Sequence, residues 1–445
     1  MHSLAVAQVL RTGSLVATAA VFRMINSSGS LKSRQAITLC CPDLKSGGIQ
    51  RMTLLIAERL LERGHAVDLL LSDRSGPLVP PTEGDIRVIA LPSSPSLVAR
   101  AAVIAADPLG LPTNLRPLVL PLKGFPSLRV LPALSRYFKA EQPRSVFAPS
   151  PDLIFSTGLA RRLAGVQTRL VASFRSHLSA GLASKSKLRG RTLLPALERA
   201  LREFSAVHAV SHAVADDLAA LFDLKRENIQ VFHSPTLSGD IEQRAAELPE
   251  HPWFAADREV PVVVAVGRIS PQKDYATLFR ALAYACRSRP LRLVVVGDDG
   301  PVKAAEGGRA KTAQRVLDLI QALDIAEAVD FVGYQPNPLS WIAHADLFAL
   351  SSRFEGLPNV VIEALACGRT VVATDAPGGT AEILREGRHG YLAAVGDAEG
   401  LGEALLKGLA QPLDPNLQKA RAADFDWQSS LEAYERLLAP AHPER

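Results

Sequence analysis

Short apolar runs, each followed by a loop, recur through the second half of this 445-residue chain. They are rich in valine and leucine and cover residues 260–266, 291–296, 329–332, 347–350 and 370–374. Near-continuous apolar runs of this kind are typical of parallel strands that are covered on both faces. Parallel neighbours need a crossover, usually a helix, to bring the chain back to the same edge of the sheet. The pattern therefore predicts an α/β domain built on a parallel sheet.

The first half of the chain shows the same alternation less regularly. Its opening predicts a strand at 36–41, a helix at 50–63 and a strand at 66–71, with Gly47 and Gly48 in the first turn. Ser211 is expected to cap a helix that runs to Leu221. The remaining strands of this half are expected at 153–156, 169–174, 207–210 and 230–232.

A chain of 445 residues is too long for one ordinary hydrophobic core. Around residues 249–258 the sequence turns polar and acidic and contains Pro249 and Pro252, which is typical of a linker. A terminal helix is expected near 429–438. The predicted segments are an extension at 1–35 that is disordered or lies on a membrane surface, an N-terminal domain at 36–248, the linker at 249–258, a C-terminal domain at 259–412 and a tail at 413–445.

Two glutamates eight residues apart bracket the most informative turn of the chain. Pro358 suits the first position of a helix, and Gly368 suits the position just after its end. Glu355 is therefore expected in a loop, and Glu363 inside a helix of about three turns.

The amides of Gly356, Leu357, Asn359 and Val360 would then have no partner within the helix. Together with the helix dipole they favour an anion or a hydroxyl-rich ligand in front of the turn. Carboxylates on either side could bind hydroxyl groups, so the turn fits a phosphorylated sugar. The simpler alternative is a surface Glu355 and a Glu363 that only solvates its helix.

A second loop follows the run at 260–266 and carries Gly267, Arg268 and Lys273. Ligands of open parallel sheets bind beyond the carboxyl ends of the strands. An arginine fork and a lysine point charge at such a place suit a diphosphate. The alternative is a pair of solvated basic residues near the start of a helix.

These two loops resemble those of the retaining glycosyltransferases of family 4, also called glycosyl transferases group 1. The resemblance rests on E-x7-E from Glu355 to Glu363, with Gly368 and the strand 370–374 behind it, and on G-R-x4-K from Gly267 to Lys273. It covers about residues 36–440. It implies the α/β fold called GT-B, in which two Rossmann-like domains face each other across a cleft and a C-terminal helix crosses back to the N-terminal domain.

The resemblance also implies roles for individual residues in the C-terminal domain. Arg268 and Lys273, after Gly267, would bind the diphosphate of a nucleotide sugar. Glu363 would hold the ribose hydroxyls, and Glu355 would contact the transferred sugar. The amides of Gly356, Leu357, Asn359 and Val360 would support that contact.

In the N-terminal domain, Gly47 and Gly48 would let the backbone approach the donor phosphates. His177 follows the strand 169–174, where the family often has a polar residue beside the donor sugar. Arg175 could fill that role instead, or His177 could be a simple surface histidine. His233 stands where the family usually has asparagine, so the contact of that asparagine is in doubt.

The function expected from this resemblance is transfer of a sugar, with retention, from a nucleotide-sugar donor, expected to be a UDP-sugar. The acceptor would be lipid-linked or a polysaccharide of the cell envelope. Two alternatives remain open: a non-hydrolysing sugar-nucleotide epimerase of the same fold, and a catalytically silent protein that binds nucleotide sugars.

We expect no metal and no cofactor besides the donor substrate. A metal-binding D-x-D loop is not evident, since Asp424 and Asp426 fit the letters but lie in the C-terminal tail. The G-x-G-x-x-G fingerprint of dinucleotide binding is missing as well.

The net charge of +5 is unevenly distributed along the chain. Residues 158–202 contain ten basic residues and only one acid, Glu198, while residues 92–138 are apolar and basic. In residues 158–202 aromatic residues are scarce, which disfavours nucleic acid and leaves an anionic membrane or a phosphorylated acceptor as the partner that explains the charge. Residues 92–138 could lie on a membrane surface, or they could form irregular helices that cover the sheet. No apolar run reaches the ~18 residues of a spanning helix. We therefore expect a cytoplasmic protein that is peripheral on the inner face of the plasma membrane. The ten residues are Arg161, Arg162, Arg169, Arg175, Lys185, Lys187, Arg189, Arg191, Arg199 and Arg202.

Overall fold

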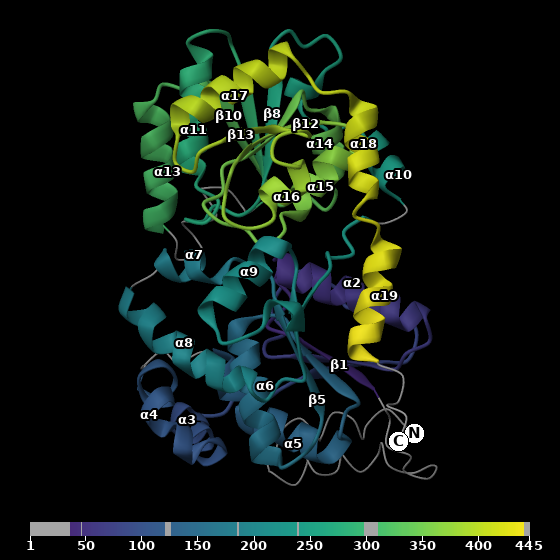
Figure 1. The fold of residues 1–445 in the computed structure, drawn as a ribbon. Helices are drawn as coiled ribbons and strands as arrows, with labels where there is room; N and C mark the ends of the chain where they lie inside the picture. Colours follow the sequence, from purple (N-terminus) through teal and green to yellow (C-terminus); the bar gives the residue numbers. More distant parts are fainter. Residues whose placement is uncertain are drawn as a thin grey trace, which may run out of the picture. The chain divides into compact units, whose positions relative to one another are not determined.

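The computed structural model describes residues 36–45, 47–120, 126–184, 187–237, 240–297 and 310–439. The extension at 1–35 lies outside the described residues. Residues Gln35–Arg445 belong to one compact unit, and this unit contains two parallel sheets (Figure 1).

The first sheet has the strand order β3-β2-β1-β4-β5-β6-β7, and its neighbouring strands pair in parallel. Along β1, Ile37, Leu39 and Cys41 pack into one hydrophobic cluster and Cys40 packs into another. Both faces of the strand are therefore covered, as expected for a parallel sheet. The strands are β1 (Ile37–Cys41), β2 (Val67–Leu71), β3 (Ile86–Ala90), β4 (Ser145–Ala148), β5 (Arg169–Phe174), β6 (Ala206–Ala209) and β7 (Ile229–Val231).

Helices lie in most of the connections between these strands and cover the sheet. They are α2 (Gly48–Glu62), α3 (Ser96–Ala106), α4 (Leu111–Asn114), α5 (Leu131–Glu141), α6 (Pro151–Ala164), α7 (Leu178–Ala183), α8 (Lys187–Leu201) and α9 (His212–Leu221). Helix α10 (Ile241–Ala246) follows the last strand of this sheet and packs against α14 (Pro338–His344). Short helical turns of other types occur at η1 (Pro108–Gly110), η2 (Leu115–Val119), η3 (Pro126–Val130), η4 (Arg226–Asn228) and η5 (Pro252–Phe254).

The second sheet has the order β10-β9-β8-β11-β12-β13 and is parallel as well. Its strands are β8 (Val262–Val266), β9 (Arg292–Val296), β10 (Val329–Gly333), β11 (Leu347–Leu350), β12 (Thr370–Thr374) and β13 (Tyr391–Ala393). Its helices are α11 (Tyr275–Cys286), α13 (Ala310–Ala322), α14 (Pro338–His344), α15 (Asn359–Ala366), α16 (Thr380–Leu384) and α17 (Ala398–Ala410), with a short turn at η7 (Ala326–Ala328). Two parallel sheets with helical crossovers confirm the predicted two Rossmann-like domains.

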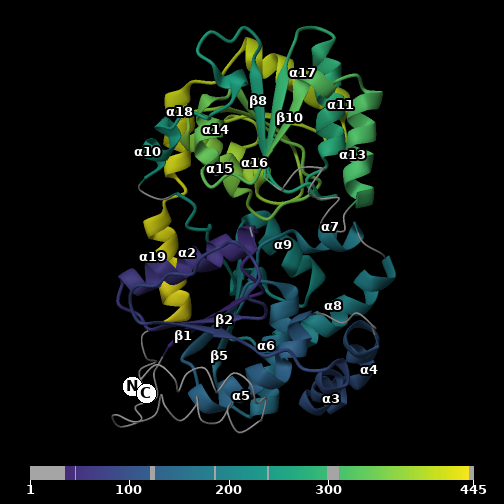
Figure 2. The ribbon, with the colours of Figure 1, turned by 180° about the vertical axis from the view of Figure 1, so that it is seen from behind.

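The C-terminal tail links elements of the two sheets. Helix α18 (Pro415–Ala423) packs against α15, and α19 (Trp427–Leu438) packs against α2 (Figures 1 and 2). Tyr434 of α19 is fully buried, with its ring centroid 5.8 Å from that of Phe147 and 4.7 Å from that of Phe232. The last helix is therefore part of the core on one face of the first sheet.

One predicted strand, at 153–156, is wrong, because these residues lie inside α6. Pro151 occupies the first turn of that helix, after Ser150 at the cap, which is the usual start of a helix. Every residue from Leu153 to Ala160 is buried, so the segment has no polar face to reveal a helical period. The strand at this place in the sheet is β4, a few residues earlier. The prediction also missed β3 and β13, which are edge strands and only partly buried.

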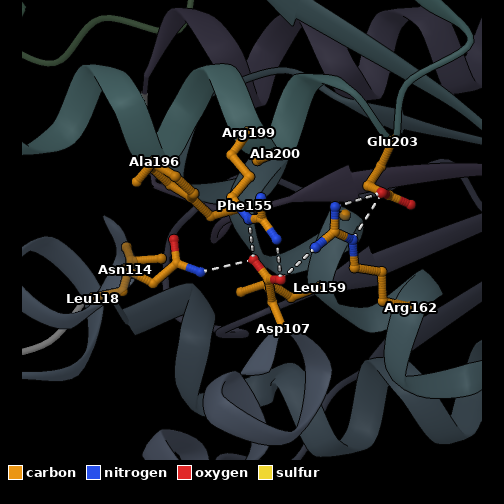
Figure 3. Close-up of a pocket in the computed structure, with 11 residues that line it drawn as sticks. Asp107, Asn114, Leu118, Phe155, Leu159, Arg162, Ala196, Arg199, Ala200 and Glu203 are labelled. Atoms are coloured by element: carbon orange, nitrogen blue, oxygen red, sulfur yellow. Dashed lines mark hydrogen bonds and ion pairs between the residues drawn. The ribbon is translucent and has the colours of Figure 1, made fainter. Parts of the chain in front are cut away.

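Residues 96–119 form a compact helical excursion made of α3, η1, α4 and η2, with α5 farther along the chain. Asp107 fixes this excursion to α6 and α8 (Figure 3). Its carboxylate accepts hydrogen bonds from Arg199 at 2.6 Å and from Asn114 at 3.0 Å, and it lies 2.8 Å from Arg162. The amide of Gly110 also donates to it, at 3.1 Å. The space left between these groups is ≈ 10 Å³, so the cluster is a packed ion-pair network and has room for one water at most.

This network neutralises part of the basic stretch at 158–202. Arg161 and Arg162 each lie 2.7 Å from the carboxylate of Glu203, just beyond the end of that stretch. With Arg199 on Asp107, three of the ten basic residues are ion-paired inside the fold. Their charge is therefore not free to attract a partner.

We predict that Asp107→Asn lowers the free energy of unfolding at pH 7 by about 2 kcal/mol, between the values for exposed and fully buried ion pairs. The hydrogen bond from Arg199 holds the pKa of Asp107 below its ordinary range, against the opposing effect of burial. The stabilisation is therefore complete above the ordinary pKa of about 3.9 and is lost as the pH falls below it.

Urea unfolding of the natural protein and of the Asp107→Asn variant, at pH 7 and at low pH, measures the difference in their free energy of unfolding. Glu198→Gln is the control, because Glu198 pairs with Arg202 at the surface and its loss should change stability by less than about 0.5 kcal/mol. An equal difference between Asp107→Asn and the natural protein at both pH values would contradict the assignment.

Candidate functional site

The loops that follow β8 and β11 meet, because these two strands are neighbours in the second sheet. Nζ of Lys273, from the first loop, lies 2.7 Å from Oε1 of Glu355, from the second. The hydroxyl of Ser352 donates to the same oxygen at 2.6 Å. Glu355 is buried, and Lys273 is largely buried. The structure thus brings two of the predicted site residues together and adds Ser352, which the sequence analysis did not single out.

Only one carboxylate oxygen of Glu355 is engaged in this arrangement. Among the described residues, no side chain or amide is bonded to its Oε2. An acceptor oxygen beside a bound ammonium group suits a ligand hydroxyl.

The backbone of the Glu355 loop is fixed by hydrogen bonds from three directions. Its own amide donates to the carbonyl of Pro377 at 2.9 Å, and the amide of His177 donates to its carbonyl at 3.0 Å. The carbonyl of Gly356 accepts from the amide of Gly379 at 2.7 Å and from the hydroxyl of Ser211 at 3.0 Å. His177 and Ser211 follow strands of the first sheet, so the loop is held between both sheets.

Gly356 is required by this close approach. A Cβ atom at this position would lie 2.2 Å from the carbonyl oxygen of Arg175, a distance that backbone atoms cannot accommodate without moving. The glycine of the E-x7-E motif therefore allows the loop after β11 to lie directly on the loop after β5.

Helix α15 differs in detail from the prediction. It begins at Asn359, with Pro358 at the cap, and its eight residues make about two turns instead of three. Gly368 follows its end with φ of +68°, the left-handed conformation expected there.

The free amides in front of α15 agree with the prediction. The first backbone hydrogen bond of this turn runs from the amide of Val361 to the carbonyl of Pro358. Within the described residues, the amides of Gly356, Leu357, Asn359 and Val360 have no acceptor. In addition, Oδ1 of Asn359 is buried without a partner. This turn has the unsatisfied polar groups that an oxygen-rich ligand would complete.

Glu363 lies in the second turn of α15 and is partly buried. Burial raises the pKa of its carboxyl group, while the positive charges of Arg51 and Arg244 act in the opposite direction. Arg51 belongs to α2 and stands over the ring of Tyr334, with 5.3 Å between its guanidinium carbon and the ring centroid. A carboxylate with two arginines in its electrostatic neighbourhood is a suitable acceptor for a diol.

Gly47 and Gly48 begin α2, which starts at Gly48 and so two residues before the prediction. Gly47 caps the helix without any side-chain hydrogen bond, and a Cβ at Gly48 would meet nothing within 4 Å. The start of this 15-residue helix is therefore open to an anion that its free amides could bind.

Arg268 is exposed and makes no ion pair with any described residue. It follows Gly267, which has φ of +153° and lies against the side chain of Lys273. The guanidinium group is thus available to a ligand on the same loop as Lys273.

The alternatives for the N-terminal partner are now distinct. Arg175 donates to the hydroxyl of Tyr434 at 3.1 Å and to that of Ser234, so its side chain is used inside the fold. His177 bonds to the Glu355 loop through its amide, and its Nδ1 lies 3.3 Å from Asp217. Its side chain is mostly buried, at 18% exposure, and so His177 is not a simple surface histidine.

Asp217 was missed by the sequence analysis. It is buried and accepts hydrogen bonds from the amides of Leu178 and Ser179, at 2.6 and 3.1 Å, and so fixes the start of α7 beside His177. It lies forty residues farther along the chain, within α9. No local spacing connects it with His177.

His233, the departure from the family pattern, has a defined contact. Its Nε2 lies 3.1 Å from Oε1 of Glu382, and the amide of His212 donates to the other oxygen of that carboxylate at 2.9 Å. Burial alone would raise the pKa of Glu382, but these hydrogen bonds hold it below the ordinary value. The histidine therefore joins β7 of the first sheet to α16 of the second.

Asp424 and Asp426 have structural partners. Asp426 caps α19 by accepting from the amide of Ser429 at 2.8 Å, and Asp424 lies 2.7 Å from Arg421 and 2.9 Å from Arg385. In the part of the chain that the structure describes, no three His, Cys, Asp or Glu side chains are gathered as metal ligands usually are.

Two family models match this chain. The model for glycosyl transferases group 1 matches residues 260–411, and the model for glycosyltransferase family 4 matches residues 46–236. The first match contains the β8 and β11 loops, and the second contains the start of α2 and His177.

Curated relatives agree with these matches. The N-acetylgalactosamine-N,N'-diacetylbacillosaminyl-diphospho-undecaprenol 4-alpha-N-acetylgalactosaminyltransferase of Campylobacter jejuni is 30% identical over 47% of this chain and 53% of its own length. The D-inositol 3-phosphate glycosyltransferase of Gordonia bronchialis is 30% identical over 68% of this chain and 70% of its own length. The lipopolysaccharide core glycosyltransferase LpsE of Rhizobium meliloti is 29% identical over 41% and 50%. The chain thus spans about half the length of two of these relatives.

Solved structures show the same fold at low identity. HepE of Anabaena, in complex with UDP and glucose, has a TM-score of 0.67 at 18% identity and covers 92% of this chain and 100% of its own. Sucrose-phosphate synthase from Thermosynechococcus elongatus has a TM-score of 0.69 at 19% identity, with coverage of 92% and 100%. Together with the family models and the Gordonia relative, these similarities show that the chain belongs to glycosyltransferase family 4, the glycosyl transferases group 1, and has the GT-B fold of that family.

Proposed function

We propose that this protein transfers a sugar, with retention of configuration, from a UDP-sugar to a lipid-linked or polysaccharide acceptor of the cell envelope. The observation that carries the proposal is the contact between Lys273 and Glu355 beside the unpartnered amides that precede α15. A cation, a carboxylate and free amides at the carboxyl ends of two neighbouring strands suit the diphosphate and the sugar of such a donor.

The donor has three chemically distinct parts, and each has a matching group in this site. The diphosphate would contact Lys273 and the exposed Arg268. The sugar would contact Glu355 through Oε2 and the amides at 356–360. The ribose hydroxyls would contact Glu363, whose carboxyl group lies within the influence of Arg51. HepE, of the same fold, has been solved with UDP and glucose, which supports this choice of donor class.

In the transfer, the bond between the anomeric carbon and the phosphate oxygen breaks, and a bond to the acceptor oxygen forms on the same face of the sugar. The departing diphosphate gains negative charge, which Arg268 and Lys273 stabilise more in the transition state than in the ground state. The proton of the acceptor hydroxyl passes to the departing phosphate oxygen. In this mechanism, the two cationic side chains serve the diphosphate without a metal ion.

The acceptor is proposed from the relatives. The Campylobacter relative is named for a diphospho-undecaprenol substrate, and LpsE is named for lipopolysaccharide core biosynthesis. A lipid-linked acceptor places the reaction at a membrane, and we propose that the protein works as a peripheral protein on the inner face of the plasma membrane. None of the described helices is both long and apolar enough to cross a bilayer.

Donor binding and turnover can be tested together. We expect UDP to raise the melting temperature, because a ligand at 100 times its Kd stabilises the native state by about 2.7 kcal/mol. Radiolabelled UDP-sugars and GDP-sugars, incubated with membrane lipids, should give a labelled glycolipid from a UDP-sugar. An epimerised free donor, or binding without any product, would overturn the proposal in favour of an epimerase or a silent binding protein.

Loss of the central contact should abolish transfer. We expect Lys273→Ala and Glu355→Gln each to lower kcat roughly 100- to 1,000-fold or more, which is the usual effect of removing one group that stabilises the transition state. Arg353→Ala is the matched control, because Arg353 is a basic residue of the loop that contains Glu355 and 56% of its side chain is exposed. It should retain activity within about twofold. Near-normal transfer by either site variant, with an unchanged melting temperature, would contradict the assignment of the site.

Glu363 should act on donor binding and not on the chemical step. A contact to the ribose is the same in the ground state and in the transition state, so Glu363→Gln should raise KM for the donor about tenfold with little change in kcat. Because burial raises the pKa of Glu363, the natural protein should lose this carboxylate at a higher pH than an ordinary glutamate does. KM for the donor should therefore rise as the pH is lowered, and the variant should not show this rise. If KM for the donor changed with pH in the same way in the natural protein and in the variant, the proposed role of Glu363 would be refuted.

A further inference from the structure

Large apolar side chains on the surface are concentrated in one part of the described chain. More than half of the exposed ones lie between residues 97 and 120. Within this range, the most exposed are Leu109 at 88% and Leu97 at 76%. Exposed apolar groups that occur singly need no explanation, but a cluster does. The six residues are Leu97, Val98, Ile104, Leu109, Leu115 and Leu120.

Helix α3 is apolar on its outer face as well as on its inner face. Ala99, Val103 and Ala106 are buried toward the core. On the outer side, Leu97, Ala101, Ile104 and Ala105 are exposed, and their spacing of three and four residues places them on one side of the helix. An 11-residue helix without a polar face needs a second apolar environment outside the fold.

The excursion holds this face firmly. The carboxylate of Asp107 ties η1 and α4 to Arg199 of α8, and Leu118 and Val119 of η2 are buried in the core. Figure 3 shows the side chains of Asn114, Arg162 and Arg199 around Asp107. Leu97 and Leu109 are therefore presented by a packed element.

All of the exposed charged side chains of residues 92–139 are basic. Between residues 92 and 139 the only acid is Asp107, and this carboxylate is neutralised by Arg162 and Arg199 inside the fold. The basic residues include the exposed Arg116 and Arg129. Apolar side chains with a basic rim match the acyl chains and the anionic headgroups of a lipid surface.

We propose that the exposed residues of α3, η1 and η2, together with Leu120 just after η2, insert into the interface of an anionic bilayer; we name them the α3 surface. The members that carry the proposal are Leu97, Ile104, Leu109, Leu115 and Leu120, with Arg116 on the rim. The inference rests on the proposed function only in that a lipid-linked acceptor makes membrane docking useful. Pairing of two copies through this surface is disfavoured, because it would bring the arginines of each rim together without an acid between them.

The test is sedimentation of the full chain with vesicles, without donor or acceptor. The protein should bind vesicles of equal parts phosphatidylglycerol and phosphatidylcholine, and bind pure phosphatidylcholine more weakly. Burial of one leucine accounts for roughly a tenfold change in partition, so the double variant Leu97→Glu, Leu109→Glu should bind at least tenfold more weakly. Both positions are highly exposed, so the melting temperature should not change.

Val79→Glu is the matched control. Val79 is 78% exposed but lies in the loop between β2 and β3, outside the α3 surface, and this variant should bind vesicles like the natural protein. Equal binding by the double variant and the natural protein, or no binding of anionic vesicles at all, would overturn the proposal. A change of oligomeric state in the double variant without a change in vesicle binding would also overturn it, because the surface would then be a contact between copies. The shift of melting temperature with UDP reports the donor site separately, so failure here is distinguishable from failure of the proposed function.

Discussion

The hydrogen bond from the amide of His177 to the carbonyl of Glu355 is the contact on which the site depends. It joins the loop after β5 of one sheet to the loop after β11 of the other. Gly356 makes this contact sterically possible, because any side chain there would meet the carbonyl of Arg175. The amide of the same glycine has no acceptor among the described residues. In the proposed function, Gly356 would therefore serve both the contact between the sheets and the recognition of the donor.

The side chain of Glu355 is preorganised by its surroundings. A buried carboxylate is costly unless it is paired, and here Lys273 and Ser352 both donate to Oε1. This pairing fixes the carboxylate and the ammonium group before any donor arrives, so neither has to reorganise during transfer. A diphosphate would then share Lys273 with Glu355, and Arg268, which is unpaired among the described residues, would supply the second positive charge.

The sequence was sufficient for five of the six strands of the second sheet and for the positions of the loops with Lys273 and Glu355, because both are encoded locally. Buried parallel strands appear as apolar runs, and the site loops follow them directly. Helix α6 was mistaken for a strand because burial on all sides removes the helical period. Asp217 and Glu382, the partner of His233, could not be found from spacing, because these contacts join residues that the fold, and not the local sequence, brings together. Ser352 stands only three residues before Glu355, but its spacing alone does not show that its hydroxyl donates to that carboxylate.

The charge of a segment, counted from the sequence, also omits the ion pairs that form only in the fold. In the sequence, the basic stretch at 158–202 and the apolar and basic segment at 92–138 were both candidates for a membrane contact, because they contain many cations and few acids. In the structure, Arg162 and Arg199 are used by Asp107, an acid from the apolar segment at 92–138. The ion pairs remove the negative charge from that segment and hold it in place with its leucines exposed. A membrane contact then depends less on the number of cations than on the place where an apolar face is exposed and the nearby acid is neutralised by ion pairs. This favours the α3 surface over the basic stretch.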